Sequence, residues 1–151
     1  MVATAMDAIT NEEQLVAFCL AGEIYGVDIS LINEIIRLRE ITQIPRTSPD
    51  IEGVINLRGK IVPILDLRKR LSLPAAERTS STRIIVIEIA DCTVGMVVDG
   101  VTGVLRMPDS NIEPPSELVS DLNAAYIRGV GKTDDQLVIL LNMPRVLRLE
   151  S

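Results

Sequence analysis

Short aliphatic runs separated by turn-forming residues recur along almost the whole chain. Runs of Val, Ile and Leu bounded by Gly, Pro, Asn, Asp or Ser are typical of β-strands joined by tight turns. The pattern predicts strands over residues 14–20, 24–28, 54–55, 61–65, 83–89, 93–98, 101–107, 125–132 and 137–142. With short helices expected at 67–71 and 144–150, the fold class is all-β with a few short helices.

One segment follows a different period. Ile29, Ile32, Ile35 and Ile36 have the spacing of one face of a helix, and Asp28 or Ser30 could cap its N-terminus. This spacing predicts a short helix over 29–36, which would place Glu34 on a helix as a solvated charge.

The segment from Gly53 to Leu71 predicts a tight hairpin. Its turn, Asn56-Leu57-Arg58-Gly59-Lys60, contains a glycine that can adopt positive φ without steric strain. We expect a type I turn at Leu57-Arg58 followed by Gly59 as the left-handed bulge residue. Arg58 would then lie at the apex. Pro63 has no backbone N–H, which favours an edge strand or a bulge at that point.

The two halves of the chain are similar to each other. Gly53-Val54 recurs as Gly129-Val130, and the run 61–67 recurs as 137–143, both displaced by 76 positions. More weakly, 26–37 aligns with 95–106, displaced by 69 positions. Such internal similarity indicates two pseudo-equivalent β units, joined through the Pro- and Ser-containing segment 72–81. Because the second unit has Thr133-Asp134-Asp135 where the first has Leu57-Arg58-Gly59, the fold does not require arginine at that turn.

Composition excludes several classes of function. The chain is 47% hydrophobic but only 2% aromatic, so Val, Ile and Leu must fill the core. A net charge of −6 opposes nucleic-acid binding, which needs a basic surface. No apolar run has membrane-crossing length, and residues 1–13, expected to be frayed, lack the positive charge of a signal peptide. We therefore expect a cytoplasmic protein that is not inserted in a membrane.

The absence of histidine from the chain weakens most enzyme hypotheses. It removes the commonest general base, the usual metal ligand and any phosphoryl-accepting histidine. Cys19 and Cys92 lie in aliphatic strand contexts, where we expect both thiols to be buried in the core. We therefore expect no catalytic residue, no metal and no cofactor.

Two further motifs are better explained by structure than by chemistry. Residues 129–133 resemble the end of a phosphate-binding loop, but Tyr126 stands where the first glycine is needed and a turn and strand follow. Asp66, at the end of an aliphatic strand, resembles a phospho-accepting aspartate, yet the chain lacks the alternating βαβ pattern. We expect Asp66 to cap the helix at 67–71.

Three segments in order resemble the CheW family, the coupling proteins of bacterial chemotaxis. The hairpin with Asn56-Leu57-Arg58-Gly59 and the following Asp66-Leu67-Arg68 is similar to the family's main landmark. Residues 23–29 and 95–101 are similar to its other two. The resemblance extends over 14–150 as a single domain. It implies two small SH3-like five-stranded barrels around a shared aliphatic core, the first over about 24–72 and the second over about 83–142, with the chain termini crossing between them.

The resemblance also implies function and partners. A protein of this kind is a non-enzymatic scaffold that links the cytoplasmic tip of methyl-accepting chemoreceptors to the regulatory domain of the histidine kinase CheA, at membrane-associated receptor arrays. The residues expected to bind receptor or kinase are Arg58, Glu34, Ile32, Asn56, Gly59 and Val101. Two alternatives stay open: a coupling domain of another chemosensory array, such as one for surface motility, or a β domain that binds a small ligand in a deep apolar pocket.

Overall fold

Two β-sheets form the body of the protein in the computed structural model, which describes residues 11–45, 48–115, 125–133 and 135–148. The strands are β1 (Glu12–Leu20), β2 (Glu23–Asp28), β3 (Ile32–Arg37), β4 (Ile51–Leu57), β5 (Lys60–Asp66), β6 (Arg83–Ile89), β7 (Cys92–Val98), β8 (Gly100–Pro108), β9 (Ile112–Glu113), β10 (Ile127–Lys132) and β11 (Leu137–Leu141). Single helical turns are η1 (Ile29–Leu31), α2 (Leu67–Arg70), η2 (Asp109–Asn111) and α4 (Met143–Val146). The fold class predicted from the sequence is confirmed.

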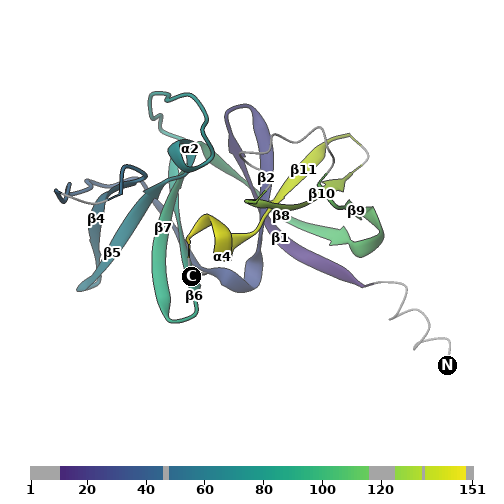
Figure 1. The fold of residues 1–151 in the computed structure, drawn as a ribbon, viewed down its shortest axis with the longest axis horizontal. Helices are drawn as coiled ribbons and strands as arrows, with labels where there is room; N and C mark the ends of the chain where they lie inside the picture. Colours follow the sequence, from purple (N-terminus) through teal and green to yellow (C-terminus); the bar gives the residue numbers. More distant parts are fainter. Residues whose placement is uncertain (1–10, 46–47, 116–124, 134, 149–151) are drawn as a thin grey trace.

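Each of the two sheets contains strands from both halves of the chain. One sheet has six strands in the order β8-β1-β2-β11-β10-β9, and the other has five in the order β3-β6-β7-β5-β4. The sheets lie side by side, with α4 beside their junction (Figure 1). Because β2 pairs with β11 and β7 pairs with β5, the sheets do not divide the chain into the expected ranges 24–72 and 83–142.

The internal repeat is visible in the strand register. In the first half the β4–β5 pairing shifts between Ile51 and Gly53, and in the second half the β10–β11 pairing shifts between Ile127 and Gly129, at the same offset of 76. Each hairpin then runs into a helical turn. Asp66 accepts a hydrogen bond from Lys69 N, as predicted, and Asn142 accepts one from Arg145 N in the equivalent position.

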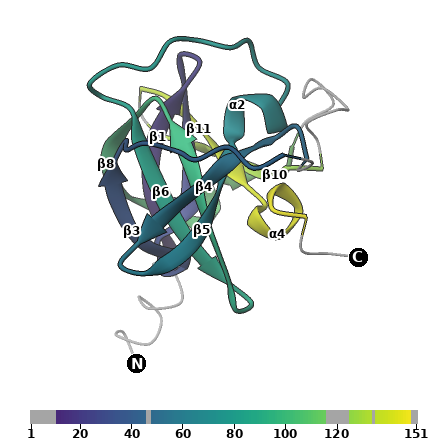
Figure 2. The ribbon, with the colours of Figure 1, turned by 90° about the vertical axis from the view of Figure 1, so that its left-hand side faces the viewer.

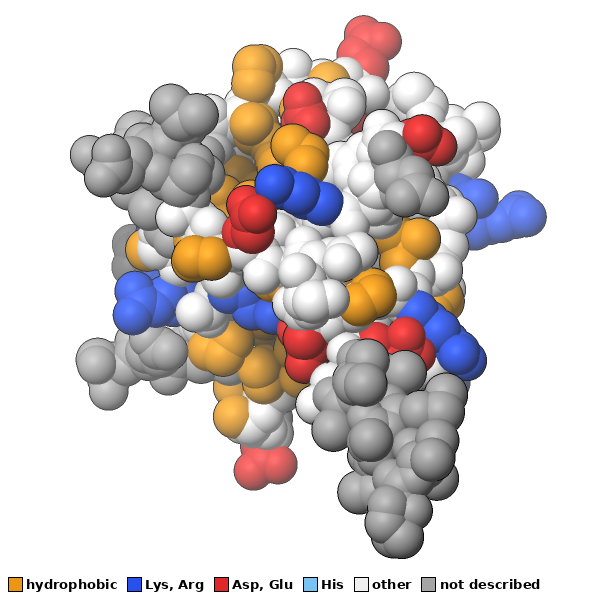
Figure 3. Space-filling view, turned by 90° about the vertical axis from the view of Figure 1, so that its right-hand side faces the viewer, with side chains coloured by type: hydrophobic (Ala, Val, Ile, Leu, Met, Phe, Trp, Pro, Cys, Tyr) orange, Lys and Arg blue, Asp and Glu red, His pale blue; other side chains and the backbone are white. Residues whose placement is uncertain are grey.

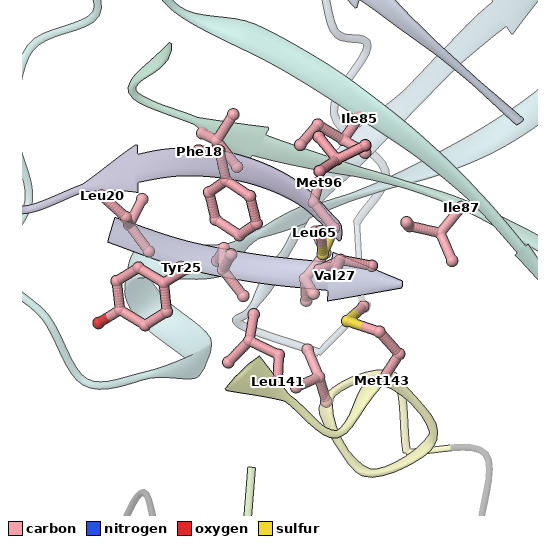
Figure 4. Packing of buried hydrophobic residues seen from close by; sticks show 14 of the residues in the cluster. Phe18, Leu20, Tyr25, Val27, Leu65, Ile85, Ile87, Met96, Leu141 and Met143 are labelled. Carbon is pink, nitrogen blue, oxygen red and sulfur yellow. The ribbon is translucent and has the colours of Figure 1, made fainter. Parts of the chain in front are cut away.

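Buried side chains form three clusters rather than one. The largest lies between the sheets and contains Phe18, Tyr25, Leu65, Ile85, Met96, Leu141 and Met143 among others (Figure 4). Side chains of the five-stranded sheet form the second cluster, and side chains of the six-stranded sheet form the third. A strand that separates two clusters is buried on both faces, which explains the unbroken buried run from Ile84 to Ile87. The shared aliphatic core is thus present.

Buried Arg70 connects α2 to α4 through a hydrogen bond and forms an ion pair with Asp50. The guanidinium of Arg70, whose side chain is 4% exposed, donates from Nε to Asp50 Oδ2 at 2.7 Å. Its Nη1 donates to the carbonyl oxygen of Val146 in α4. Val146 is the repeat equivalent of Arg70, so the same position of each half meets at the junction of the sheets.

The helix predicted over 29–36 is wrong. Only η1 is helical, and Asp28 caps it by accepting a hydrogen bond from Ser30 N. The rest of the segment is β3, which pairs with β6 and contains one unpaired extra residue between Ile32 and Glu34. This bulge leaves Ile32 and Ile35 opposite Ile87 and Ile85, two residues of the shared core. The bulge therefore places Ile32 and Ile35, three residues apart, on one face of a strand, and this spacing imitates the period of a helix.

Other expectations need smaller corrections. Residues 1–10 lie outside the described residues, but Glu12 and Glu13 already belong to β1. Cys19 and Cys92 are half-buried rather than core residues. The segment 129–133 is the end of a strand and the start of its turn, and it is not a phosphate-binding loop. The C-terminal helix covers 143–146, and 149–151 lie outside the described residues, as do 116–124 of the loop expected over 108–122.

Candidate functional site

The tip of the β4–β5 hairpin presents Arg58 and Gly59 at a two-residue turn, because Leu57 pairs directly with Lys60. Both turn residues have positive φ, 52° for Arg58 and 85° for Gly59. Positive φ at both central positions defines a type I′ turn, so the predicted type I turn with a bulge is wrong. Asn56 Oδ1 accepts a hydrogen bond from Gly59 N at 2.8 Å and holds the turn closed.

Pro63, four residues after the turn, does not mark an edge strand. It lies on β5 in the interior of the sheet order, between β4 and β7. The pairing of β5 with β7 begins only at Ile64, so the missing N–H of Pro63 removes no bond from that ladder. The bulge of this hairpin lies instead on β4, between Ile51 and Gly53.

Arg58 and Glu34, both named as binding candidates in the sequence analysis, form a bidentate ion pair. The two guanidinium nitrogens Nη1 and Nη2 donate to the two carboxylate oxygens of Glu34. The hydrogen bonds from Arg58 hold the pKa of Glu34 below its ordinary value, and the same bonds raise the pKa of Arg58. The Arg58 side chain is 69% exposed, so the pair is accessible to a partner.

The curvature of the five-stranded sheet brings this pair together. β3 and β4 are the two edges of the sheet, yet β3 lies beside the tip of the β4–β5 hairpin (Figure 2). The segment after β3 closes the gap: Arg39 Nη1 donates to the Asn56 carbonyl at 3.1 Å, and Thr42 pairs with Val54. Gly53 permits this close approach, because a Cβ there would lie 2.2 Å from the Thr42 carbonyl oxygen. Sheet closure therefore fixes Arg58 against Glu34.

The apolar residues of the predicted site lie apart from this pair. Ile32 and Val101 are half-buried and pack against the shared core. Val101 also lines a shallow groove of about 290 Å³ where the two sheets meet, together with Cys19, Ile35, Ser81, Arg83, Asp99 and Gly100. Ile35 is 39% exposed there, and its repeat equivalent Val104 on β8 is 59% exposed.

Ile35 and Val104 are site candidates that the sequence analysis missed. The helical reading of 29–36 treated Ile35 as part of an apolar helix face. An alternating pattern over Glu34, Ile35 and Ile36, read as a strand, would have placed Ile35 opposite its two neighbours.

A second ion pair joins two of the sequence landmarks, and a backbone donor of the β1–β2 turn adds to it. Arg68 donates from Nε to Asp99 Oδ1 at 3.2 Å and from Nη2 to Asp99 Oδ2 at 2.5 Å. Ala21 N donates to Asp99 Oδ2 at 2.9 Å. Burial opposes ionisation of Asp99, but the hydrogen bonds from Arg68 and Ala21 N outweigh it, so its pKa lies below the ordinary value. The pair fastens α2 to the β1–β2 turn and the start of β8.

The described residues offer little for a cofactor. They contain no group of three or more Cys, Asp and Glu side chains placed to hold a metal ion. A cavity of about 50 Å³ beneath residues 75–82 is lined by charged side chains, including Asp66, Arg68, Arg78 and Asp99. It does not match the deep apolar pocket that a small-ligand domain would need. No helix among the described residues is both long and apolar enough to cross a membrane.

Comparison with known proteins agrees with this architecture. The family model described as a CheW-like domain matches residues 14–151. The chain is 36% identical to "Chemotaxis protein CheW" of Bacillus subtilis, covering 95% of this chain and 92% of that protein. It is 32% identical to "Protein FrzA" of Myxococcus xanthus, over 91% of this chain and 86% of that protein.

A solved structure shows the same fold. The crystal structure of the scaffolding protein TtCheW from Thermoanaerobacter tengcongensis superposes with a TM-score of 0.81, at 39% sequence identity, covering 87% of this chain and 90% of that one. The protein therefore belongs to the CheW family of chemotaxis scaffold proteins.

Proposed function

We propose that this protein couples the cytoplasmic tip of methyl-accepting chemoreceptors to the regulatory domain of the kinase CheA, without catalytic activity of its own. In this role it is a cytoplasmic protein recruited to membrane-associated receptor arrays. The observation that carries the proposal is the exposed Arg58–Glu34 pair at the hairpin tip, in a chain that belongs to a scaffold family. A charged pair at a rim provides specificity and orientation more than bulk affinity, as a reversible scaffold requires.

The backbone at Arg58 supports a role in binding. A left-handed conformation is uncommon for residues other than Gly, Asn and Asp, and costs an L-residue about 1–2 kcal/mol. The second hairpin closes without an arginine, through a loop in which Thr133 N donates to the Gln136 carbonyl at 2.9 Å. Ala21 and Ala90 occupy the same left-handed position in the two-residue turns of the β1–β2 and β6–β7 hairpins, so this kind of turn does not require arginine and the Arg58 side chain is available for recognition.

The groove at the sheet junction supplies the apolar part of the proposed interface. Ile35 and Val101 line it from different sheets, and the neighbouring residue Glu34 projects from the other side of β3, where it pairs with Arg58. A receptor helix lying along this groove would contact aliphatic side chains while its flank reaches the charged pair, the usual arrangement of an apolar centre and polar rim. On the opposite end of the molecule hydrophobic, acidic and basic side chains are intermixed (Figure 3).

Calorimetric titration tests the proposal. The protein is titrated separately with a receptor cytoplasmic hairpin and with the CheA regulatory domain from the same source, and both are expected to bind saturably. Arg58→Gly should keep or raise the thermal midpoint because glycine accepts positive φ, yet weaken receptor binding about tenfold. Arg58→Ala should change the unfolding free energy by no more than about 0.5 kcal/mol.

Lys132→Ala is the matched control. Lys132 is an exposed cation of the second hairpin, paired with Glu113 at 3.0 Å, so its loss removes a comparable surface pair. Receptor affinity should stay unchanged in this variant. Failure of the well-folded wild-type protein to bind either partner would refute the coupling role.

The similarity to "Protein FrzA" bears on which array the protein serves. A family member with a different name is nearly as similar as those named for chemotaxis, so membership alone does not identify the array. Coupling in another chemosensory array is therefore the second candidate function. Parallel titrations with receptor hairpins from each chemosensory system of the source would distinguish the two.

A further inference from the structure

Two arginines face each other across neighbouring strands at one end of the groove. Arg37, the last residue of β3, pairs in register with Arg83, the first residue of β6. Like charges directly opposite each other on adjacent strands are destabilising. Within the described part of the chain neither guanidinium forms an ion pair, so the repulsion is not relieved by a neighbouring carboxylate.

Both arginines line one open cleft of about 500 Å³. Its other lining residues are a leucine and three hydroxyl-bearing side chains, so no acidic residue contributes: the set is Arg37, Leu38, Thr79, Ser80, Thr82 and Arg83. Arg83 is anchored through Nη1, which donates to the carbonyls of Ser80 at 2.8 Å and Thr82 at 2.9 Å. Its Nε and Nη2 have no acceptor among the described residues. The cleft therefore concentrates positive charge on a protein whose net charge is −6.

The repeat supplies an internal comparison. Arg106 on β8 is the equivalent of Arg37 at the offset of 69, and its register partner is the neutral Gln14. Arg106 also has an acidic neighbour, with Nη1 3.7 Å from Glu12 Oε1. The fold thus accommodates a neutral partner and a compensating acid at this position. The paired, uncompensated arginines of the first unit are not required by the architecture.

The cationic cleft is continuous with the groove. Arg83 lines both, and Arg37 lies two residues beyond Ile35, so its side chain projects to the same side of β3. The carboxylate that lines the groove, Asp99, is already held by Arg68 and Ala21 N. A partner helix that contacts Ile35 would therefore bring its next turn over two guanidinium groups that form no ion pair within the described part of the chain.

We propose that this cleft binds a carboxylate side chain of the receptor hairpin, one helical turn from the apolar residue that contacts Ile35. This inference rests on the proposed function and adds a second, independent charge contact to that of Arg58. Guanidinium groups bind carboxylates through paired N–H donors, and two arginines with nearby hydroxyls offer more donors than one carboxylate can use. The contact fixes the direction of the helix in the groove, because Arg58 and the Arg37–Arg83 cleft recognise different points on the partner.

Charge reversal at Arg37 tests the inference in the protein as a whole chain of residues 1–151. Arg37→Glu should weaken binding of the receptor hairpin by about tenfold or more, because a carboxylate would then face a carboxylate. The thermal midpoint should be unchanged or higher, since the substitution places opposite charges across the strand pair. Arg37→Gln should show a smaller loss of affinity.

Arg106→Glu is the matched control, with the same change of net charge at the equivalent strand position. At 0.15 M salt, where the Debye length is about 8 Å, it should alter receptor affinity by no more than about twofold. Equal losses in Arg37→Glu and Arg106→Glu would attribute the effect to net charge and overturn the inference.

The remaining outcomes separate the inference from the proposed function. Wild-type affinity in Arg37→Glu, with binding lost in Arg58→Gly, would overturn the cleft and leave the coupling role intact. No binding by the wild-type protein would refute the coupling role itself. A loss of affinity confined to the kinase regulatory domain would overturn the receptor as occupant. Binding of inorganic phosphate that Arg37→Glu abolishes, with hairpin affinity unchanged, would show a free-anion site instead.

Discussion

The two hairpin units of this protein share a backbone and differ in what their tips present. β4–β5–α2 and β10–β11–α4 have the same register, the same displaced pairing after their first residue and the same side-chain cap at the helical turn. The first ends in Arg58-Gly59, paired to Glu34, and the second in the loop that Thr133 and Gln136 close. What the units share maintains the fold, and what differs is available for recognition.

The units also differ at the junction of the sheets. Arg70 of α2 is buried and paired with Asp50, whereas its equivalent in α4 is Val146, and Tyr126 stands at the equivalent of Asp50. The backbone bond is nevertheless the same: Asp66 N donates to the Asp50 carbonyl and Asn142 N to the Tyr126 carbonyl, both at 2.8 Å. The same backbone arrangement therefore holds the Arg70–Asp50 ion pair in the first unit and Val146 with Tyr126 in the second.

The largest expected effect comes from adding a methyl group where each unit closes its sheet. Gly53→Ala would place Cβ 2.2 Å from the Thr42 carbonyl oxygen, while Gly129→Ala would place it 2.9 Å from the Glu113 carbonyl oxygen. Both neighbours are backbone, so the strain cannot be relieved by a rotamer change. We expect Gly53→Ala to lower the unfolding free energy by at least about 3 kcal/mol and Gly129→Ala by about 1 kcal/mol. Urea denaturation measures both, and equal losses would show that the units close equally tightly.

Next in size is the buried ion pair. Asp50→Ala leaves Arg70 buried without its carboxylate, which should cost about 2 to 3 kcal/mol, at the low end for buried pairs because solvent reaches Asp50. The double variant Asp50→Ala/Arg70→Val imitates the apolar second unit and should recover most of that loss. A double variant less stable than Asp50→Ala would show that apolar side chains cannot replace the ion pair in the first unit.

The turn residues provide a smaller contrast. Gly59→Val forces a β-branched side chain into φ near 85° and should cost about 2 kcal/mol. Asp135, its repeat equivalent, is exposed, so Asp135→Val should change stability by less than about 0.5 kcal/mol. Thermal denaturation of the two variants compares them directly. A stable Gly59→Val variant would contradict the type I′ turn.

The smallest effect is the pH dependence of the tip. The pKa of Glu34 is lowered in the folded protein by the hydrogen bonds from Arg58. A lowered folded pKa means that the pair contributes stability above the unfolded pKa, and that this contribution disappears as the pH falls through the folded value. An NMR titration of the Glu34 carboxyl should show the lowered pKa, and Arg58→Ala should raise it. An identical titration in both proteins would show that the pair does not form in solution.

Sequence reasoning succeeded where local patterns determine structure. Aliphatic runs predicted the strands, the position of Asp66 predicted the cap of α2, and the offset of 76 predicted the duplicated hairpin. It failed where a local irregularity imitates another period. The bulge between Ile32 and Glu34 placed isoleucines three residues apart on one face, so periodicity indicated a helix where β6 supplies a pairing partner.

The sequence by itself determined the β-rich class, the repeat and the family, and it singled out Arg58 as a binding candidate, because these depend on residue types and spacings within short segments. Only the tertiary structure decided that the halves exchange strands and that Arg58 meets Glu34. It also decided that Arg37 and Arg83 share a cleft free of acidic side chains. Those relations depend on pairing between segments distant along the chain and on the curvature that joins the edges of a sheet. Neither the strand pairing nor the sheet curvature can be predicted from a local pattern, because both arise when the chain buries its three hydrophobic clusters together.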